Sequence, residues 1–295
     1  MNLLRDEQHL SAATEHAGLS AAGAQLLSSH ATSVYLLPRE GAVARITHSV
    51  RDGMHARTAI ALTRWLRDQD IPVTEPLIDD AVEVDEATVT FWRHYPQEDQ
   101  RGPAFHEFAW ILRRLHVLPL PPMIAIPEYV PLAALRSDLK HPDHLDSEDR
   151  DWLCARANEL VAAYTQLDSK LGVGLVHGDA YIGNTLWDAD GQLLLGDWDE
   201  ASFAPRELDL ANTYHDIVRF GTSESDIAAF TRGYRGWDVR EWSGFPVLQQ
   251  IRGLHTLSAY IRRARRGDTA AGEELRFRID SLRRGDETAT WHAAP

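Results

Sequence analysis

Three oxygen-bearing side chains stand close together in one segment of the sequence. Asp179 follows a short apolar run, and Asn184 comes five residues later. A turn at 188–191 then leads into a second apolar run, 193–195, which is followed by Asp197. Because the runs on either side of the turn read as strands of a hairpin, Asn184 and Asp197 are expected at the same end of adjacent strands. Carboxylate and amide oxygens are ligands that Mg²⁺ prefers, so the segment predicts a magnesium site beside Asp179.

This arrangement suits phosphoryl transfer. In that reaction a carboxylate orients the attacking hydroxyl and accepts its proton, while metal ions neutralise charge on the nucleotide phosphates. We therefore assign Asp179 as the catalytic base and Asn184 and Asp197 as magnesium ligands. His177 is expected to pack beneath the loop, and Asp199 either to bind a second ion or to hydrogen-bond the loop.

The spacing of these residues is similar to that of a known enzyme family. The motif HGDxxxxN over 177–184, followed by DWD over 197–199, resembles the aminoglycoside-phosphotransferase family. Protein kinases instead use H-R-D-x-x-x-x-N and D-F-G. The resemblance covers most of the chain, because 201–211 is similar to the family segment that ends in DLA, and LRRLH at 112–116 to its LxxLH helix.

The resemblance implies a fold, an activity and further site residues. It implies a kinase that moves the γ-phosphate of ATP or GTP to a hydroxyl of a small molecule with Mg²⁺ as cofactor. Family members phosphorylate aminoglycoside and macrolide antibiotics, choline, sugars and homoserine. By the same likeness Asp209 would brace the catalytic loop, and Phe91, Trp92 and Arg93 would line the hinge where adenine stacks.

The chain departs from the family pattern in the part expected to bind nucleotide. The third strand normally carries a lysine for the α- and β-phosphates, but no lysine precedes Lys140, which leaves Arg45 for this role. An arginine keeps its charge and can grip phosphate oxygens bidentately. The following helix has no glutamate between 49 and 66. The usual glycine-rich loop is replaced by SSHATS over 28–33, where Ser29, Thr32 and Ser33 are the candidate phosphate ligands.

Hydrophobic periodicity separates a strand-rich first third from a helical remainder. Strands are expected at 24–28, 33–37, 42–47 and 87–92, and one main helix at 55–67. Helices are expected at 105–117, 147–167, 207–220, 225–234, 247–266 and 271–284. The pattern predicts an α+β chain with a small, mostly β N-terminal lobe and a larger helical C-terminal lobe. The family resemblance implies that this is a bilobal, protein-kinase-like fold, with a small antiparallel lobe over 1–95 that binds nucleotide and a larger helical lobe over 96–295 with the catalytic loop and acceptor site.

The composition limits the classes of molecule that the protein is expected to bind. The net charge of -14 over 295 residues argues against a nucleic-acid binder. The acidity fits either simple solubility or the attraction of a cationic, hydroxylated acceptor, such as an amino-bearing antibiotic or sugar. No apolar stretch is long enough for a membrane helix. A single cysteine, Cys154, and a polar N-terminus fit a reducing cytoplasm. The oligomeric state is left open.

Two other functions remain open. A nucleotide-binding regulatory relative without activity would explain the missing lysine and glutamate of the first lobe. A metallohydrolase could use His177, Asp179, Asp197 and Asp199 as ligands, but zinc and two-metal sites commonly recruit several histidines, and the other histidines here show no ligand spacing.

Overall fold

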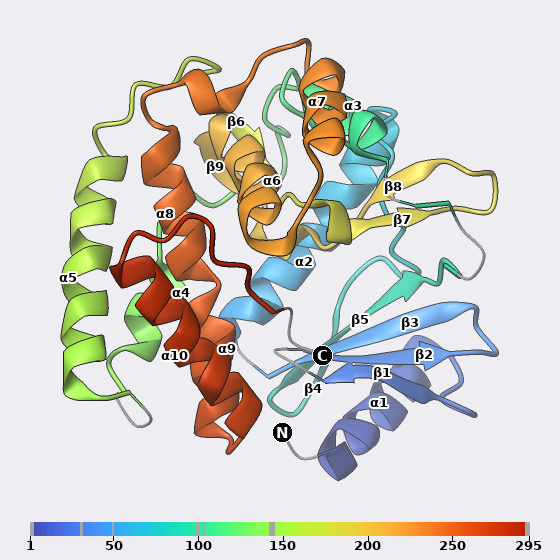
Figure 1. The fold of residues 1–295 in the computed structure, drawn as a ribbon. Helices are drawn as coiled ribbons and strands as arrows, with labels where there is room; N and C mark the ends of the chain where they lie inside the picture. Colours follow the sequence, from blue (N-terminus) through green and yellow to red (C-terminus); the bar gives the residue numbers. More distant parts are fainter. Residues whose placement is uncertain are drawn as a thin grey trace. The chain divides into compact units, whose positions relative to one another are not determined.

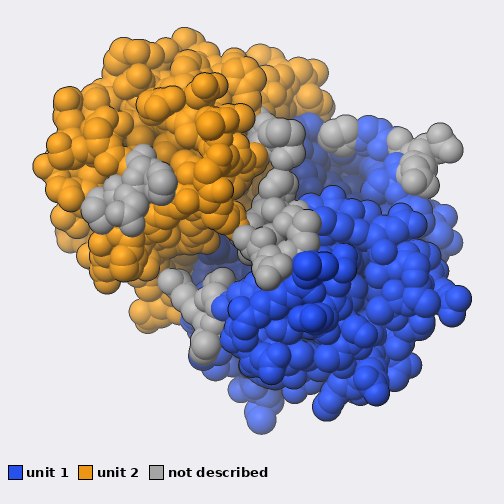
Figure 2. All heavy atoms as spheres, turned by 90° about the horizontal axis from the view of Figure 1, so that it is seen from below, with its two compact units in different colours: residues 1–127, 182–202 blue, residues 128–181, 203–295 orange. Residues whose placement is uncertain are grey.

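The computed structural model describes residues 3–29, 32–48, 50–97, 101–102, 104–141 and 145–292. The chain forms two compact units, coloured separately in Figure 2. The first comprises residues 1–127 and 182–202, and the second comprises residues 128–181 and 203–295. The segment that carries Asp179 and Asn184 therefore passes from the second unit into the first between residues 181 and 182.

The first unit contains an antiparallel sheet of five strands in the order β1-β2-β3-β5-β4. The strands are β1 (Gln25–Ser29), β2 (Ser33–Leu37), β3 (Ala42–Thr47), β4 (Val82–Val84) and β5 (Ala87–Arg93). The turn at 38–41 joins β2 to β3 with Leu37 opposite Ala42, so two of the predicted strands form a hairpin. Gly41 adopts a positive φ of 56° there, a conformation that glycine reaches without a steric penalty.

Alternation along the strands gives the sheet two different faces. Ala44 and Ile46 of β3 point to the face covered by α1 (Leu3–Ala17), where they form a core with Leu10 of that helix. The other face carries Arg45 and meets α2 (Val50–Asp68), so the two helices lie on opposite sides of the sheet (Figure 1). Strand periodicity therefore sends Arg45 away from the α1 core.

A second, smaller hairpin completes the first unit. Strands β7 (Thr185–Trp187) and β8 (Leu193–Leu195) pair antiparallel, and short 3-10 turns, η1 (Ile182–Asn184) and η2 (Trp198–Glu200), flank them. The segment at 72–74 ties β8 to the rest of the unit, because the Thr74 N–H donates to the Leu195 carbonyl at 3.1 Å. Helix α3 (Phe105–Leu115) packs against β8.

The second unit is mainly helical. Strands β6 (Val173–Val176) and β9 (Ser202–Pro205) pair with each other, α8 contacts α5 and α6, and α9 contacts α10 and α4 (Figure 1). Its helices are α4 (Ala133–Asp138), α5 (Ser147–Tyr164), α6 (Glu207–Phe220), α7 (Glu224–Gly233), α8 (Phe245–His255), α9 (Leu257–Arg265) and α10 (Thr269–Arg283), with a 3-10 turn, η3 (Val239–Glu241), before α8.

Most predicted elements are present, with one correction and three additions. The helix predicted at 247–266 is two helices, α8 and α9, which meet at Thr256. Apolar periodicity continues through this junction, so the pattern alone did not reveal it. Strands β4 and β9 and helix α4 were not predicted because all three are short. Among the described residues, no helix combines the length and apolar character needed to cross a membrane.

Candidate active site

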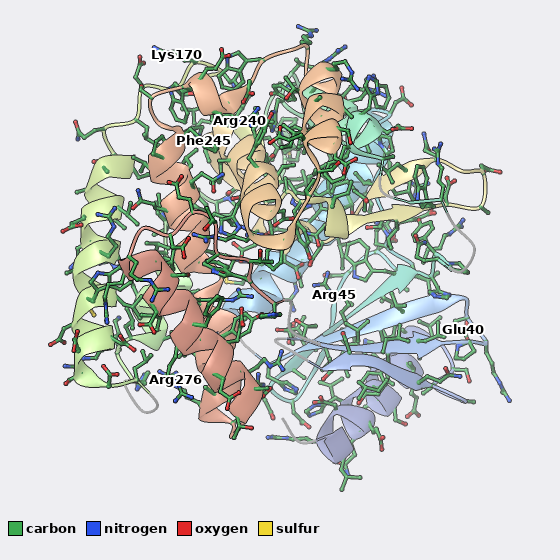
Figure 3. All side chains as sticks on the ribbon, viewed as in Figure 1. Glu40, Arg45, Lys170, Arg240, Phe245 and Arg276 are labelled. Carbon is green, nitrogen blue, oxygen red and sulfur yellow. The ribbon has the colours of Figure 1, made fainter. Side chains whose placement is uncertain are left out.

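Arg45 lies between two of the acidic side chains that the sequence singled out. Its Nη2 atom is 2.8 Å from Oδ1 of Asp197 and 2.8 Å from Oδ2 of Asp199. Figure 3 labels Arg45 on β3, and the two carboxylates come from the chain just after β8. A strand and a hairpin far apart in the sequence thus place one guanidinium against both carboxylates within the first unit.

The charges of this cluster depend on one another. Burial opposes the charge of Arg45, but Asp197 and Asp199 outweigh it and raise the pKa of the guanidinium above its usual range. Burial also raises the pKa of Asp199, with Asp197 and Glu200 adding to the effect and Arg45 opposing it. A positive charge nearby favours the ionised form of these carboxylates, and the guanidinium of Arg45 supplies that charge here.

The β7–β8 hairpin brings Asn184 and Asp197 to the same end, as expected. Thr185 is opposite Leu195, and the Gly196 N–H donates to the Asn184 carbonyl at 2.8 Å. Asp197 adopts a left-handed backbone with φ of 59°. For a residue other than glycine this conformation is uncommon, and such residues cluster at functional sites. The carboxylate and amide oxygens fit a hard cation such as Mg²⁺, and the guanidinium already places positive charge against Asp197.

A cavity of about 190 Å³ in the first unit collects several of the candidate residues. Its walls include Arg45, Trp92, Arg93, Asn184 and Asp197. Trp92 donates from Nε1 to the hydroxyl of Thr90 at 2.9 Å, which fixes its indole ring. The cavity thus combines an aromatic side chain, a guanidinium and side-chain oxygen atoms.

Other candidates for nucleotide contacts lie elsewhere. Ser33 is fully buried, and its hydroxyl donates to Oδ2 of Asp6 at 2.6 Å, which directs it toward α1. Phe91 is buried in the core under α1, on the face opposite to Trp92. Thr32 is half-buried and does not line the cavity, while the Ser29 side chain lies outside the described residues.

Asp179 has its own cationic partner in the second unit. Nη1 of Arg252, on α8, lies 2.5 Å from Oδ1 of Asp179. Burial by itself would raise the pKa of Asp179, but Arg252, His255 and His177 outweigh burial and hold the pKa below its usual value. The carboxylate is therefore ionised near neutral pH, as a proton acceptor must be.

Hydrogen bonds from α6 support the backbone around Asp179. The N–H groups of His177 and Gly178 donate to the two oxygens of Asp209 at 2.8 and 2.9 Å. Asn212 donates to the Gly178 carbonyl at 2.8 Å. His177 is fully buried, and its Nδ1 lies 3.3 Å from the N–H of Asp179. These contacts fix the loop through backbone groups.

A further acid belongs to this cluster. Burial raises the pKa of Asp216, on α6, to about 7, with Asp179 adding to the rise and Arg252 opposing it. Arg252 is itself buried, and the carboxylates of Asp179 and Asp216 overcome its burial and raise its pKa. A single arginine thus faces two carboxylates in the second unit, much as Arg45 does in the first.

Comparison with known proteins identifies the family of the chain. The sequence profile of the phosphotransferase enzyme family (APH) matches residues 23–245. The chain belongs to this family. The matched region includes the HGD and DWD motifs. It also includes every residue of the two arginine–carboxylate clusters except Arg252, which lies beyond residue 245. A search of curated proteins found no significant match.

Solved structures share the fold of this phosphotransferase-family chain. An amicoumacin kinase in complex with AMP-PNP, Ca²⁺ and Ami is 15% identical, with a TM-score of 0.74 over 98% of this chain and 97% of its own. The GDP complex of wild-type aminoglycoside 2'-phosphotransferase-IIIa is 14% identical, with a TM-score of 0.65 over 95% and 99%. A microcompartment-associated aminopropanol kinase is 16% identical, with a TM-score of 0.64 over 97% and 99%. These likenesses confirm the predicted kinase-like α+β fold.

Sequence reasoning missed two residues of the second cluster. Arg252 interrupts the otherwise apolar buried positions of α8, which include Leu248, Ile251 and Leu254. A charged residue on an apolar helix face usually has a buried partner, and this signal was available in the sequence. Asp216 gives a weaker signal, because it follows His215 on a helix with several polar residues.

Proposed function

We propose that this chain is a small-molecule kinase that transfers the γ-phosphate of ATP or GTP to a hydroxyl group. The observation that carries the proposal is the cavity of the first unit, where Asn184 and Asp197 stand beside Arg45 and Trp92. Oxygen ligands, a guanidinium and an indole are suited to a metal ion, phosphates and a purine base, respectively. Membership of the phosphotransferase family supports the same reaction class.

Asp179 acts as the catalytic base in this proposal. The acceptor hydroxyl gives its proton to the Asp179 carboxylate while its oxygen forms a bond to the γ-phosphorus. The bond from that phosphorus to the oxygen bridging to the β-phosphate breaks, and the nucleoside diphosphate leaves with the bonding electrons. Arg252 and the bracing contacts of Asp209 keep the carboxylate ionised and the loop in place.

Asn184 and Asp197 would hold Mg²⁺, which supplies positive charge to the nucleotide phosphates when bound. Arg45 would then exchange its contacts with Asp197 and Asp199 for phosphate oxygens, which a guanidinium grips bidentately. The metal ion would replace the guanidinium as the counter-charge of the carboxylates. In this way Arg45 would take the part of the lysine that the first unit lacks.

The acceptor in this proposal carries an amino group as well as the hydroxyl. The net charge of -14 favours the approach of a cation. The structural relatives include an aminopropanol kinase and an aminoglycoside phosphotransferase, whose names point to amino-bearing acceptors. An antibiotic or an amino alcohol is therefore the first class to screen.

A thermal shift measurement tests the nucleotide site without an acceptor. Ligand binding raises the melting temperature by mass action, so ATP or GTP with Mg²⁺ should raise it and EDTA should remove the rise. Release of ADP or GDP is then assayed with a panel of aminoglycosides and amino alcohols. Asp179→Asn should abolish release and keep the thermal shift, whereas Asp190→Asn, at the exposed hairpin turn, should keep both. Turnover by Asp179→Asn would refute the base assignment.

A second candidate is a nucleotide-binding relative without activity. The observation that favours it is that both carboxylates of the first cluster already engage Arg45. Under this function the thermal shift would appear, but none of the acceptors would cause release of nucleoside diphosphate above the background of Asp179→Asn.

A further inference from the structure

A second cavity, of about 740 Å³, lies within the helical unit. It is bounded by α5, α6, α8, the C-terminal end of α10 and the segment that follows α10. Figure 3 labels one of its lining residues, Phe245, at the first turn of α8. The volume is in the range of pockets that hold small organic molecules. Asp179, Tyr181 and Arg252 are not among the described residues that line it.

Arg219, on α6, contributes a buried positive charge to this cavity. The residue is 6% exposed, and its Nη1 donates to the carbonyls of Asp286 at 2.7 Å and Ala289 at 3.1 Å. Its guanidinium also lies 4.4 Å from the centre of the Trp291 ring. Within the described part of the chain, no carboxylate forms an ion pair with it.

The charge of Arg219 is therefore only partly compensated. Burial lowers the pKa of its guanidinium, and the carboxylates of Asp286 and Glu287 offset this only in part. An arginine nevertheless stays protonated in a protein. A buried cation whose charge is only partly balanced by nearby carboxylates is unfavourable, and an anion in the cavity would supply the remaining charge.

Two neutral groups in the cavity wall also lack partners. Both ring nitrogens of His215 are buried without a hydrogen bond, and the residue is 2% exposed. Nε2 of Gln249 is likewise buried without an acceptor. Burial is the main cause that lowers the pKa of His215 well below its usual value, so its ring is neutral and can donate from one nitrogen. Two unused donors thus accompany the guanidinium.

The rest of the wall carries both charged and apolar side chains, among them the carboxylate of Glu287. Arg156 and Arg283 line the cavity but are neutralised by Glu159 and Asp149, respectively. Apolar surface is provided by Trp152, Phe245, Leu254 and Leu282. Such a wall suits a ligand with an anionic head and an apolar body.

We propose that this cavity binds a small organic anion, with a carboxylate or phosphate head on Arg219, His215 and Gln249. The apolar body of the ligand packs against Trp152 and Phe245. Because Asp179, Tyr181 and Arg252 do not line this cavity, the ligand is distinct from the molecule that is phosphorylated. Two residues of its wall are sequence neighbours of residues that interact with Asp179: His215 precedes Asp216, and Gly253 follows Arg252.

Isothermal titration calorimetry with three probes at constant ionic strength tests the site. Benzoate and phenyl phosphate share an aromatic body and differ in the head, while acetate keeps the carboxylate and lacks the body. We expect benzoate or phenyl phosphate to bind, and the stronger of the two identifies the head. Acetate should bind about tenfold more weakly or worse, because it buries less apolar surface.

Matched variants connect binding to the cavity. Arg219→Gln removes the charge and should weaken binding about tenfold or more, since hydrogen bonds to charged groups are among the strongest. Gln249→Leu, at a half-buried position, provides a second test if Arg219→Gln is less stable. Arg276→Gln changes an exposed arginine of α10, labelled in Figure 3, and should leave binding unchanged. Circular dichroism checks that each variant is folded.

Three results would overturn the proposal. The first is that neither aromatic probe binds the wild-type protein more tightly than acetate. The second is equal weakening by Arg276→Gln and Arg219→Gln, which would indicate general surface charge. The third is unchanged binding in both folded cavity variants. None of these outcomes depends on kinase activity, so the test is independent of the proposed function.

Discussion

Arg252 and Asp179 form an ion pair in the second unit, with Nη1 and Oδ1 2.5 Å apart. Arg252 comes from the last turn of α8, so this helix holds the carboxylate that we propose as the base. Both groups are largely buried, and removal of either leaves the other charge without its partner in a poorly solvated place. The pair therefore couples the stability of the helical unit to the protonation of the loop.

Replacement of Arg252 by methionine should be strongly destabilising. Breaking a buried pair from one side typically costs about 3–5 kcal/mol, because the remaining charge is uncompensated. Urea unfolding measures the change in the free energy of unfolding, with Arg276→Met as the control on an exposed helix surface. The double variant Asp179→Asn/Arg252→Met should be more stable than the sum of the single changes predicts. Strict additivity would argue against a coupled pair.

Asp216 predicts a pH dependence of stability. Its pKa of about 7, raised chiefly by burial, lies above the value in the unfolded chain. Between about pH 4 and pH 7 the folded protein keeps a proton that the unfolded chain releases, so the free energy of unfolding falls as pH rises through this window. Asp216→Asn removes the titration, and at about pH 8 it should be more stable than the wild type by on the order of 3 kcal/mol.

Urea unfolding at about pH 5 and about pH 8 checks the Asp216 prediction, because the stability advantage of Asp216→Asn over the wild type should be clearly smaller at the lower pH. Asp280→Asn, at an exposed position of α10, serves as the control and should have the same effect at both pH values. A difference between wild type and Asp216→Asn that does not change with pH would contradict the prediction.

Removal of the Arg45 charge should change metal binding in the absence of nucleotide. Without the guanidinium, Asp197 and Asp199 are neighbouring carboxylates with no cation, so Arg45→Met should bind Mg²⁺ alone about tenfold more tightly than the wild type. The same variant should bind ATP or GTP more weakly, because it lacks the phosphate ligand. Calorimetry measures both affinities, and Arg39→Met, in the exposed β2–β3 turn, should change neither. Unaltered Mg²⁺ affinity in Arg45→Met would show that the guanidinium does not occupy the metal's place.

The bracing role of Asp209 can be compared with a similar but exposed contact. Asp209→Ala removes the acceptor of two buried N–H groups, those of His177 and Gly178, and should cost about 2 kcal/mol or more. Asp188 also accepts from two N–H groups, but in an exposed turn where water can replace it. Asp188→Ala should therefore cost less than about 1 kcal/mol. Equal losses of unfolding free energy in the two variants would contradict a special role for the buried contact.

The sequence by itself determined the elements whose signals are local. Turn residues at 38–41 and 188–191 and the apolar runs beside them specify two hairpins, because hairpin register follows from turn length. The second hairpin places Asn184 and Asp197 at one end, as predicted. The long helices were likewise visible in their periodicity, except where α8 and α9 follow each other without a strong break signal.

Tertiary structure alone decided which side chains meet. Alternation along a strand separates Phe91 from Trp92, but only the packing of α1 on one face shows that Phe91 belongs to the core. In the same way Ser33 donates to Asp6 of α1, a contact that its loop sequence does not encode. The pairs of Arg45 with Asp197 and of Arg252 with Asp179 join residues far apart in the chain. Such pairs depend on which elements pack together, because a charge finds its partner in space and not along the sequence.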